Sequence, residues 1–339
     1  MNTITLSMLA KELQLSISTV SKALHDSHEI SNETKQLVLK KAKELNYQVN
    51  PFASGLRKKK SKTIAVVLPE IANNFFSLAI NGVETIAQDK GYHVLIYLTH
   101  EDLKKEITTM SLLQNGRVDG VLISLSCATT GISHIEELRS KDIPIVFFDR
   151  VADNMNVPKV TTDDKKSGLN GTEHLIEQGC RRIAFLSLSD NLSINKKRLE
   201  GYEESLAKHG IKADPSLIVH CGTDDQKNNM LLRKLLSRKK LPDGIFSSVE
   251  RLAIPCYEIC HEFGIKIPDQ VKVITFSNLQ TASLLNPSLT TITQPAFEIG
   301  KEAASILFKL IEKKGINFIT EKTILESTLV PRRSTAIVQ

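Results

Sequence analysis

The sequence predicts a mixed α/β protein: a small all-helical N-terminal domain of helix-turn-helix type, then a larger body with parallel sheets in two sub-domains. Three observations predict it. Helical periodicity fills the first sixty residues, and apolar strand-like runs alternate with amphipathic helices from Thr63 onward. The chain has 339 residues, enough for more than one hydrophobic core.

The first helix is expected after Thr5, a plausible N-cap. Its apolar residues are spaced i, i+3, i+4 and i+7, which marks one face of a helix, and they are Leu6, Leu9, Ala10 and Leu13.

A second helix is expected after a tight break at Gln14-Leu15. Ser16 can cap it, and its buried positions are predicted to be Val20 and Leu24. Two short helices separated by so few residues are typical of a helix-turn-helix.

A polar stretch over residues 25–31 leads to a third helix that closes the small core. Ser31 is its expected cap, and its inner face is predicted to hold Val38, Ala42 and Leu45.

The positive charge of the chain is concentrated in this N-terminal segment. Residues 1–60 hold ten cations and five anions, a net of +5, whereas the whole chain carries +6. A basic head on a nearly neutral body indicates a polyanionic partner for the head, although a solvated charged face would have the same composition.

The segment between Tyr47 and Lys62 is too short and too polar to fold alone. Asn50-Pro51 can start a short helix, and the run Arg57–Lys60 follows it. We expect a linker, or a helix that forms only against a partner.

From Thr63 onward the chain predicts repeated βαβ units, and so a parallel sheet covered on both faces. Two sub-domains with a ligand crevice at the carboxyl ends of the strands suit this length. The expected strands are Thr63–Leu68, His93–Tyr97, Gly120–Ser124, Pro144–Phe148, Ile183–Ser187, Gly244–Ser247 and Val271–Thr275.

An ordered set of motifs resembles the lactose/galactose-repressor (LacI/GalR) family of transcriptional regulators over essentially the whole chain. In the head the matching segments are Thr5–Leu24, Ile30–Thr34, Leu45–Tyr47 and Leu56-Arg57. In the body they are Asn73–Phe76, Gly91-Tyr92, Arg117–Val121, Phe147–Arg150, Gly264–Pro268 and Leu289–Pro295.

The resemblance implies three parts. Residues 1–47 would be the helix-turn-helix DNA-binding domain, residues 48–62 a hinge helix or linker, and residues 63–339 a two-lobed, periplasmic-binding-protein-like effector and dimerisation domain. Lobe one would comprise about residues 63–162 and 294–325, and lobe two about residues 163–293 and 326–339.

The resemblance also places a recognition helix at Ser16, with Ile17, Ser18 and Lys22 at base edges of the major groove. Hydroxyl groups would contact phosphates, and they belong to Thr5, Ser16, Thr19, Ser21, Ser31, Thr34 and Tyr47. For Ser16 and Ser31 helix capping alone is the competing explanation, and for Ile17 it is a place in the core.

The family's hinge leucine corresponds to Leu56, with Ala53 beside it and Arg57 as the minor-groove cation. Gly55 departs from the family pattern and predicts a less stable hinge helix. A flexible basic linker is the alternative.

The effector pocket implied by the family includes Phe75, Phe76, Asp149 and Arg198. Two positions that usually hold an amide or carboxylate for sugar hydroxyls are here Val249, beside Glu250, and Ser277. Because those anchors differ, Arg198 together with Arg150 points to an anionic sugar derivative. The alternatives are a salt bridge for Arg198 and plain core packing for one of the two phenylalanines.

Other functional classes lack support in the sequence. There is no G-x-G-x-x-G after the first body strand, no Walker motif and no G-x-S-x-G elbow, so we expect no enzyme and no cofactor. Cys256 and Cys260 lie at i, i+4 but lack a second pair, so no metal site is expected. Asp163-Asp164 and Asp224-Asp225 are expected to be loop or cap carboxylates.

We therefore expect a cytoplasmic repressor that binds a pseudo-palindromic operator as a homodimer and responds to a sugar, sugar phosphate or sugar acid. No membrane span or secretory signal is apparent, and the five cysteines are scattered. A solute-binding protein, an α/β enzyme and a regulator switched by a protein co-regulator are the competing hypotheses.

Overall fold

The computed structural model describes residues 4–47, 61–312 and 321–336. The chain divides into two compact units, Met1–Ser61 and Lys62–Gln339, called here the head and the body. The expected hinge residues Ala53, Leu56 and Arg57 lie outside the described residues.

The head contains three helices: α1 (Leu6–Glu12), α2 (Ile17–Leu24) and α3 (Asn32–Glu44). Each starts at a hydroxyl N-cap, and these are the predicted Thr5, Ser16 and Ser31. Gln14, in the tight break between α1 and α2, has a left-handed φ of 52°.

The head core consists of small and branched side chains, namely Leu9, Ala10, Val20, Ala23, Val38 and Ala42. The expectation for α2 was wrong in one position, because Ala23 is buried whereas Leu24 is half-buried. Position 23 lies three residues after Val20, as close to the inner stripe as position 24, and the small alanine lets the helices approach.

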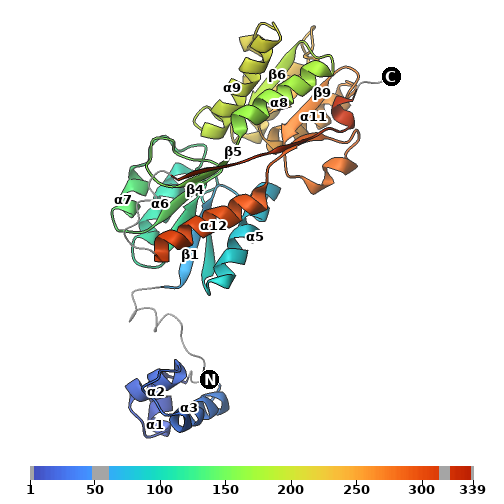
Figure 1. Cartoon of the computed structure of the whole chain (residues 1–339). Coiled ribbons are helices and arrows are strands. Elements are labelled where there is room, and N and C mark those ends of the chain that lie inside the picture. The colour runs from blue at the N-terminus through green and yellow to red at the C-terminus, as the bar shows by residue number, and fades with distance from the viewer. Residues whose placement is uncertain (1–3, 48–60, 313–320, 337–339) are drawn as a thin grey trace. The chain divides into compact units, whose positions relative to one another are not determined.

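The body consists of two lobes, each with a six-stranded sheet between helices (Figure 1). In lobe one the strand order is β11-β5-β4-β3-β1-β2, and all pairs are parallel. The strands are β1 (Thr63–Leu68), β2 (His93–Leu98), β3 (Gly120–Ile123), β4 (Ile145–Phe148), β5 (Lys159–Thr162) and β11 (Lys322–Leu325).

Helices cover both faces of this sheet. On one face α5 (Asn74–Asp89) and α12 (Ala296–Glu312) pack side by side, and the other face carries α6 (Leu103–Leu113) and α7 (Ser133–Arg139).

Lobe two repeats the plan in the order β12-β10-β9-β8-β6-β7, with only β10–β12 antiparallel. Its strands are β6 (Ile183–Ser187), β7 (Ile218–His220), β8 (Gly244–Ser247), β9 (Lys272–Phe276), β10 (Thr290–Thr293) and β12 (Thr328–Val330). Its helices are α8 (Asp164–Glu177), α9 (Ser193–Lys208), α10 (Asp225–Leu236) and α11 (Glu250–Glu262), with short 3₁₀ turns η1 (Pro215–Leu217), η2 (Gln280–Leu284) and η3 (Arg333–Thr335).

The chain crosses between the lobes three times: after β5, after β10 and after β11. This confirms the predicted α/β class with parallel sheets. Five strands went unpredicted, namely β5, β7, β10, β11 and β12. They are three or four residues long, and two are rich in threonine, so they lack the apolar run that identified the others.

Candidate functional sites

The exposed face of α2 in the head carries the residues predicted to read bases. Ile17 is 52% exposed, which excludes a place in the core, and Ser18 is exposed beside it. Lys22 forms an ion pair with Glu29 and lowers the pKa of that carboxyl group. These side chains lie on the surface and are not part of the head core.

Three of the seven hydroxyl groups predicted to contact phosphates cap the head helices. Ser16 Oγ accepts from Thr19 N at 3.0 Å, Ser31 Oγ from Thr34 N at 3.3 Å, and Thr5 Oγ1 from Met8 N at 3.3 Å. Ser21 is half-buried within α2, and Tyr47 packs against the head core.

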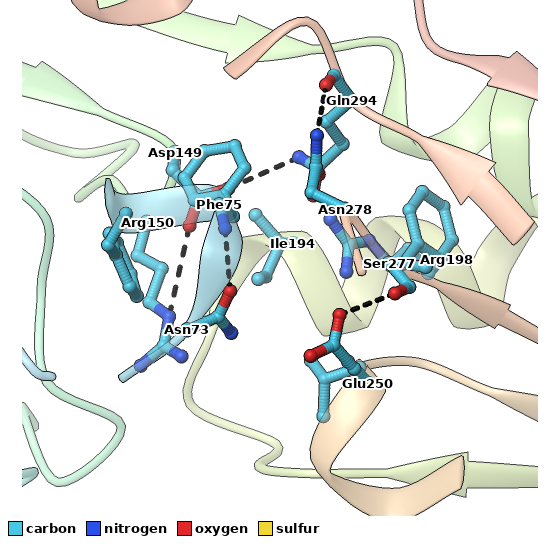
Figure 2. Close-up of a pocket in the computed structure, with 13 residues that line it drawn as sticks. Asn73, Phe75, Asp149, Arg150, Ile194, Arg198, Glu250, Ser277, Asn278 and Gln294 are labelled. Atoms are coloured by element: carbon cyan, nitrogen blue, oxygen red, sulfur yellow. Dashed lines mark hydrogen bonds and ion pairs between the residues drawn. The ribbon is translucent and has the colours of Figure 1, made fainter. Parts of the chain in front are cut away.

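In the body, all seven residues predicted for the effector pocket line one pocket between the lobes (Figure 2). The space inside the pocket is about 370 Å³ when open solvent is included. The seven are Phe75, Phe76, Asp149, Arg150, Arg198, Glu250 and Ser277.

The two phenylalanines are both in the core and in the pocket. They begin α5, where Asn73 Oδ1 accepts from Phe75 N at 2.9 Å, and their rings meet edge to face at 5.3 Å. Both side chains are 5% exposed or less and line the pocket, so plain core packing for one of them stays an open alternative.

Asp149 follows β4 and has a left-handed φ of 57°, a strained conformation for a non-glycine residue. Gln294 Nε2 donates to Asp149 Oδ1 at 3.4 Å and to Thr162 Oγ1 at 3.1 Å. Burial raises the pKa of Asp149, and the positive charges of Arg150 and Arg198 partly offset this effect.

Arg198 lies on α9 with only 1% of its surface exposed. Its Nε donates to Asp164 Oδ1 at 2.7 Å, its Nη1 donates to Ser248 O at 2.6 Å, and its guanidinium lies 3.6 Å from the centre of the Phe276 ring. Arg198 is thus both a buried ion-pair residue and part of the pocket wall.

Close packing of α8 against α9 brings Asp164 to Arg198. A Cβ at Gly168 would lie 2.4 Å from Arg198 O, and one at Gly201 would lie 2.1 Å from Lys165 O, so only glycine permits this approach. The expectation that Asp164 is a loop or cap carboxylate was wrong, because it is 2% exposed and paired with Arg198. Burial raises its pKa to about 6. Asp224, by contrast, caps α10 as expected.

Arg150 is buried, its guanidinium lies 5.6 Å from the centre of the Phe76 ring, and two carboxylates lie next to it. Its Nη1 donates to Glu101 Oε1 at 2.6 Å, and its Nε lies 3.9 Å from Asp149 Oδ2. Burial opposes its charge, but Glu101 and Asp149 outweigh burial and raise the pKa of Arg150.

Glu250 occupies the first turn of α11 and accepts a hydrogen bond from Ser277 Oγ. The carboxylate therefore lies at the wall where the sequence suggested that a polar anchor was missing. Val249, named from the sequence as a pocket position without its usual polar anchor, also lines the pocket. Further lining residues were not predicted as ligand contacts, namely Asn73, Ile194, Phe276, Asn278 and Gln294. Asn73 and Gln294 lie in the motifs Asn73–Phe76 and Leu289–Pro295, so the sequence could have indicated these two as pocket residues.

The lobes also meet beside the pocket. The backbone oxygen of Cys127, in the loop after β3, lies 3.3 Å from Ser189 Oγ and 3.4 Å from Asn191 Nδ2 of lobe two. Glu101 holds this loop, because its Oε2 accepts from Cys127 N at 2.7 Å.

Cys256 and Cys260 are buried in the lobe-two core, where burial raises the pKa of both thiols. Among the described residues no group of three or more His, Cys, Asp or Glu side chains is arranged to hold a metal ion. In the same part of the chain, no helix is both long and apolar enough to span a bilayer.

A helix-turn-helix head joined to a two-lobed body with a pocket between its lobes defines a class of bacterial DNA-binding regulator. Family models agree: residues 5–50 match "Bacterial regulatory proteins, lacI family", and residues 61–333 match "Periplasmic binding proteins and sugar binding domain of LacI family". The chain belongs to the LacI family of transcription regulators.

Among its relatives, the ribose operon repressor of Halalkalibacterium halodurans is 32% identical over 96% of both chains. The transcriptional repressor CytR of Escherichia coli K12 is 29% identical over 98% of this chain and 96% of its own. These relatives are transcriptional regulators and not enzymes.

Solved structures show the same fold. The lac repressor dimer bound to operator and an anti-inducer superposes with a TM-score of 0.83 at 21% identity, covering 98% of this chain and 99% of its own. A LacI-family regulator from Enterococcus faecium with bound ribose superposes with a TM-score of 0.71 at 26% identity, covering 82% and 100%.

Proposed function

We propose that the protein is a transcriptional repressor that binds a pseudo-palindromic operator as a homodimer and is switched by a sugar or sugar derivative between its lobes. The observation that carries the proposal is the pocket, because polar and aromatic side chains from both lobes converge there. A ligand that contacts both lobes favours one lobe arrangement, and differential affinity is what a switch requires.

The head supplies the DNA contacts in this proposal. Ile17, Ser18 and Lys22 enter the major groove, while phosphates are bound by Thr5, Ser16, Thr19, Ser21, Ser31, Thr34 and Tyr47. By resemblance, Leu56 with Ala53 and Arg57 acts at the minor groove. The three domains are then 1–47, 48–62 and 63–339, with the lobes divided as the sequence suggested.

Dimerisation is assigned to lobe one, at the edge strand β2. Leu95 and Ile96 are 42% and 40% exposed there on successive positions, hence on opposite faces of the sheet. No strand among the described residues pairs with the outer edge of β2. An apolar uncovered edge invites a partner, and a second copy of the chain suits a palindromic operator.

The test begins with operators selected from random duplex DNA by the full chain. We expect an inverted repeat, one dimer bound per site, and a changed dissociation constant when a ligand from a sugar panel is added. Selection of no sequence would refute the DNA-binding role. Sequence-specific binding that no sugar or sugar derivative alters would refute the sugar switch and favour a protein co-regulator.

A further inference from the structure

The charge balance around the pocket indicates what kind of ligand it accepts. Both arginines that line it are already neutralised by carboxylates. Arg198 directs Nε and Nη2 at the same oxygen, Asp164 Oδ1, each at 2.7 Å, and gives Nη1 to Ser248 O. Arg198 can still donate a hydrogen bond to a ligand, but its positive charge is already balanced by Asp164. Phe276 covers one face of its guanidinium group.

Arg150 is balanced in the same way. Glu101 takes its Nη1 at 2.6 Å, and Asp149 lies 3.9 Å from its Nε. Glu101 is itself fixed by Cys127 N, so its carboxylate cannot leave without releasing the loop after β3. An anionic ligand group at Arg150 would therefore compete with a built carboxylate contact.

The carboxylates around the pocket outnumber the cations. Asp149 and Glu250 line it, and Glu101 and Asp164 stand directly behind the two arginines. Nearby cations have partners elsewhere: Lys197 lies 3.5 Å from Asp153, and Arg251 pairs with Asp225 at 2.9 Å. No lysine lines the pocket among the described residues.

The polar atoms left without a partner suit hydroxyl groups. Among the pocket-lining residues, the buried atoms without a hydrogen-bond partner are the acceptor Asn278 Oδ1 and the donors Arg150 Nε and Arg198 Nη2. A hydroxyl group donates and accepts at once, whereas a phosphate or carboxylate only accepts. Glu250, held by Ser277, adds an acceptor for a second hydroxyl.

We infer that the pocket takes an uncharged polyhydroxylated ligand and rejects the phosphorylated and carboxylated forms of such a ligand. This inference rests on the proposed function and deepens it. It replaces the expectation from sequence that Arg150 and Arg198 select an anionic sugar derivative. Glu250 is the residue that decides this selectivity.

The first experiment compares matched compounds by thermal shift and calorimetry on the full chain. The probes are ribose, glucose and galactose, each against its phosphate and against the corresponding sugar acid. We expect any binder to be neutral, with its charged forms at least about 10-fold weaker. Tighter binding of a phosphate or an acid than of its neutral parent would overturn the inference.

A second experiment needs no ligand, so it tests the inference even if none of the probe compounds binds. Val249→Cys places a thiol in the pocket wall beside Glu250, and Leu284→Cys places one on a surface position that is 79% exposed. Cationic and anionic methanethiosulfonate reagents then report the local potential, with wild type as background. We expect the cationic-to-anionic rate ratio to be about 10-fold higher at position 249. An equal or lower ratio would overturn the inference.

A variant pair tests the role of Glu250. Glu250→Gln should weaken, by about 10-fold, the affinity for a neutral sugar that binds. It should also reduce the difference in affinity between that sugar and its phosphate, because the carboxylate that repels the anion is gone. Glu258→Gln, an exposed change on the same helix, should alter neither. If the difference in affinity between the neutral sugar and its phosphate is unchanged in Glu250→Gln, Glu250 does not determine the selectivity. Operator binding, measured alongside, fails only if the proposed function fails.

Discussion

At the residue scale, two buried carboxylates close to Arg198 determine how the pocket wall responds to pH. The pKa of Asp149 is raised by burial, and so is that of Asp164, which reaches about 6 with Asp149 adding to the rise. A carboxyl group whose pKa is higher in the folded state binds protons preferentially in that state. Ionising it therefore lowers the free energy of unfolding as the pH rises between the two pKa values.

For Asp164 this window runs from 3.8 to about 6. Relative to Asp164→Asn, which does not titrate, the free energy of unfolding of wild type should fall by about 3 kcal/mol across it. Urea unfolding of both proteins at several pH values measures the difference. A difference that stays constant, or grows with pH, would contradict the raised pKa. Asp163→Asn on the neighbouring, less buried carboxylate is the control.

Lys22, the residue proposed to contact a guanine, forms an ion pair within the isolated chain. Its ammonium group is paired with Glu29, so DNA binding at a guanine must replace or share that contact. Because both side chains are exposed, breaking the ion pair between Lys22 and Glu29 costs little free energy.

Lys22→Ala should weaken binding to the selected operator by about 1–3 kcal/mol and relax the base preference at one position of each half-site. Competition binding against operator variants measures both effects. Lys43→Ala, an exposed lysine in the last turn of α3, is the matched control. An equal loss on every sequence would show that Lys22 contacts a phosphate instead.

At the element scale, the head helices depend on caps that are also candidate phosphate contacts. Ser31 accepts from Thr34 N at the start of α3, so its conformation is fixed before DNA arrives. Capping and phosphate binding are compatible, because a hydroxyl that accepts one bond still has a proton to donate.

Ser31→Ala and Ser31→Asp separate these two roles. Asp caps a helix as well as Ser does, so only Ser31→Ala should destabilise α3, by about 1 kcal/mol. Both should weaken DNA binding, because alanine cannot donate and aspartate repels phosphate. Hydrogen exchange of the α3 amides and salt-dependent operator titration are the measurements. Wild-type affinity in Ser31→Asp would leave Ser31 with capping alone.

At the scale of the whole molecule, the chain crosses between the two lobes three times, and side chains from both lobes line one pocket. Contacts near the pocket, such as Cys127 O with Asn191, join the lobes without contacting the ligand site itself. In the proposed switch, a ligand would therefore act on an arrangement that already has its own stabilising contacts.

Dimerisation through β2 makes a prediction at this scale. Ile96→Lys should yield monomers at micromolar concentrations and lower operator affinity at least about 10-fold, because two linked heads bind a palindrome far better than one. Sedimentation equilibrium and operator titration measure this. Ile324→Lys, an equally drastic change on the opposite edge strand β11, should leave the dimer intact. The reverse result would move the interface to β11.

The sequence by itself determined the fold class, the head helices with their caps, and the strands with long apolar runs. Those features depend on local periodicity, capping chemistry and continuous apolar segments, which are visible over a few neighbouring residues. Short threonine-rich strands such as β10 were not predicted, because they are strands through pairing with neighbouring strands and not through an apolar composition.

The chemistry of the pocket was decided only by the tertiary structure. The sequence could show Arg150 and Arg198 as cations, but not that Glu101 and Asp164 neutralise them, since those partners lie 49 and 34 residues away along the chain. Glycines on α8 and α9 allow the helix approach that buries Asp164. Electrostatic selectivity depends on distances between side chains, and only the folded chain sets those distances.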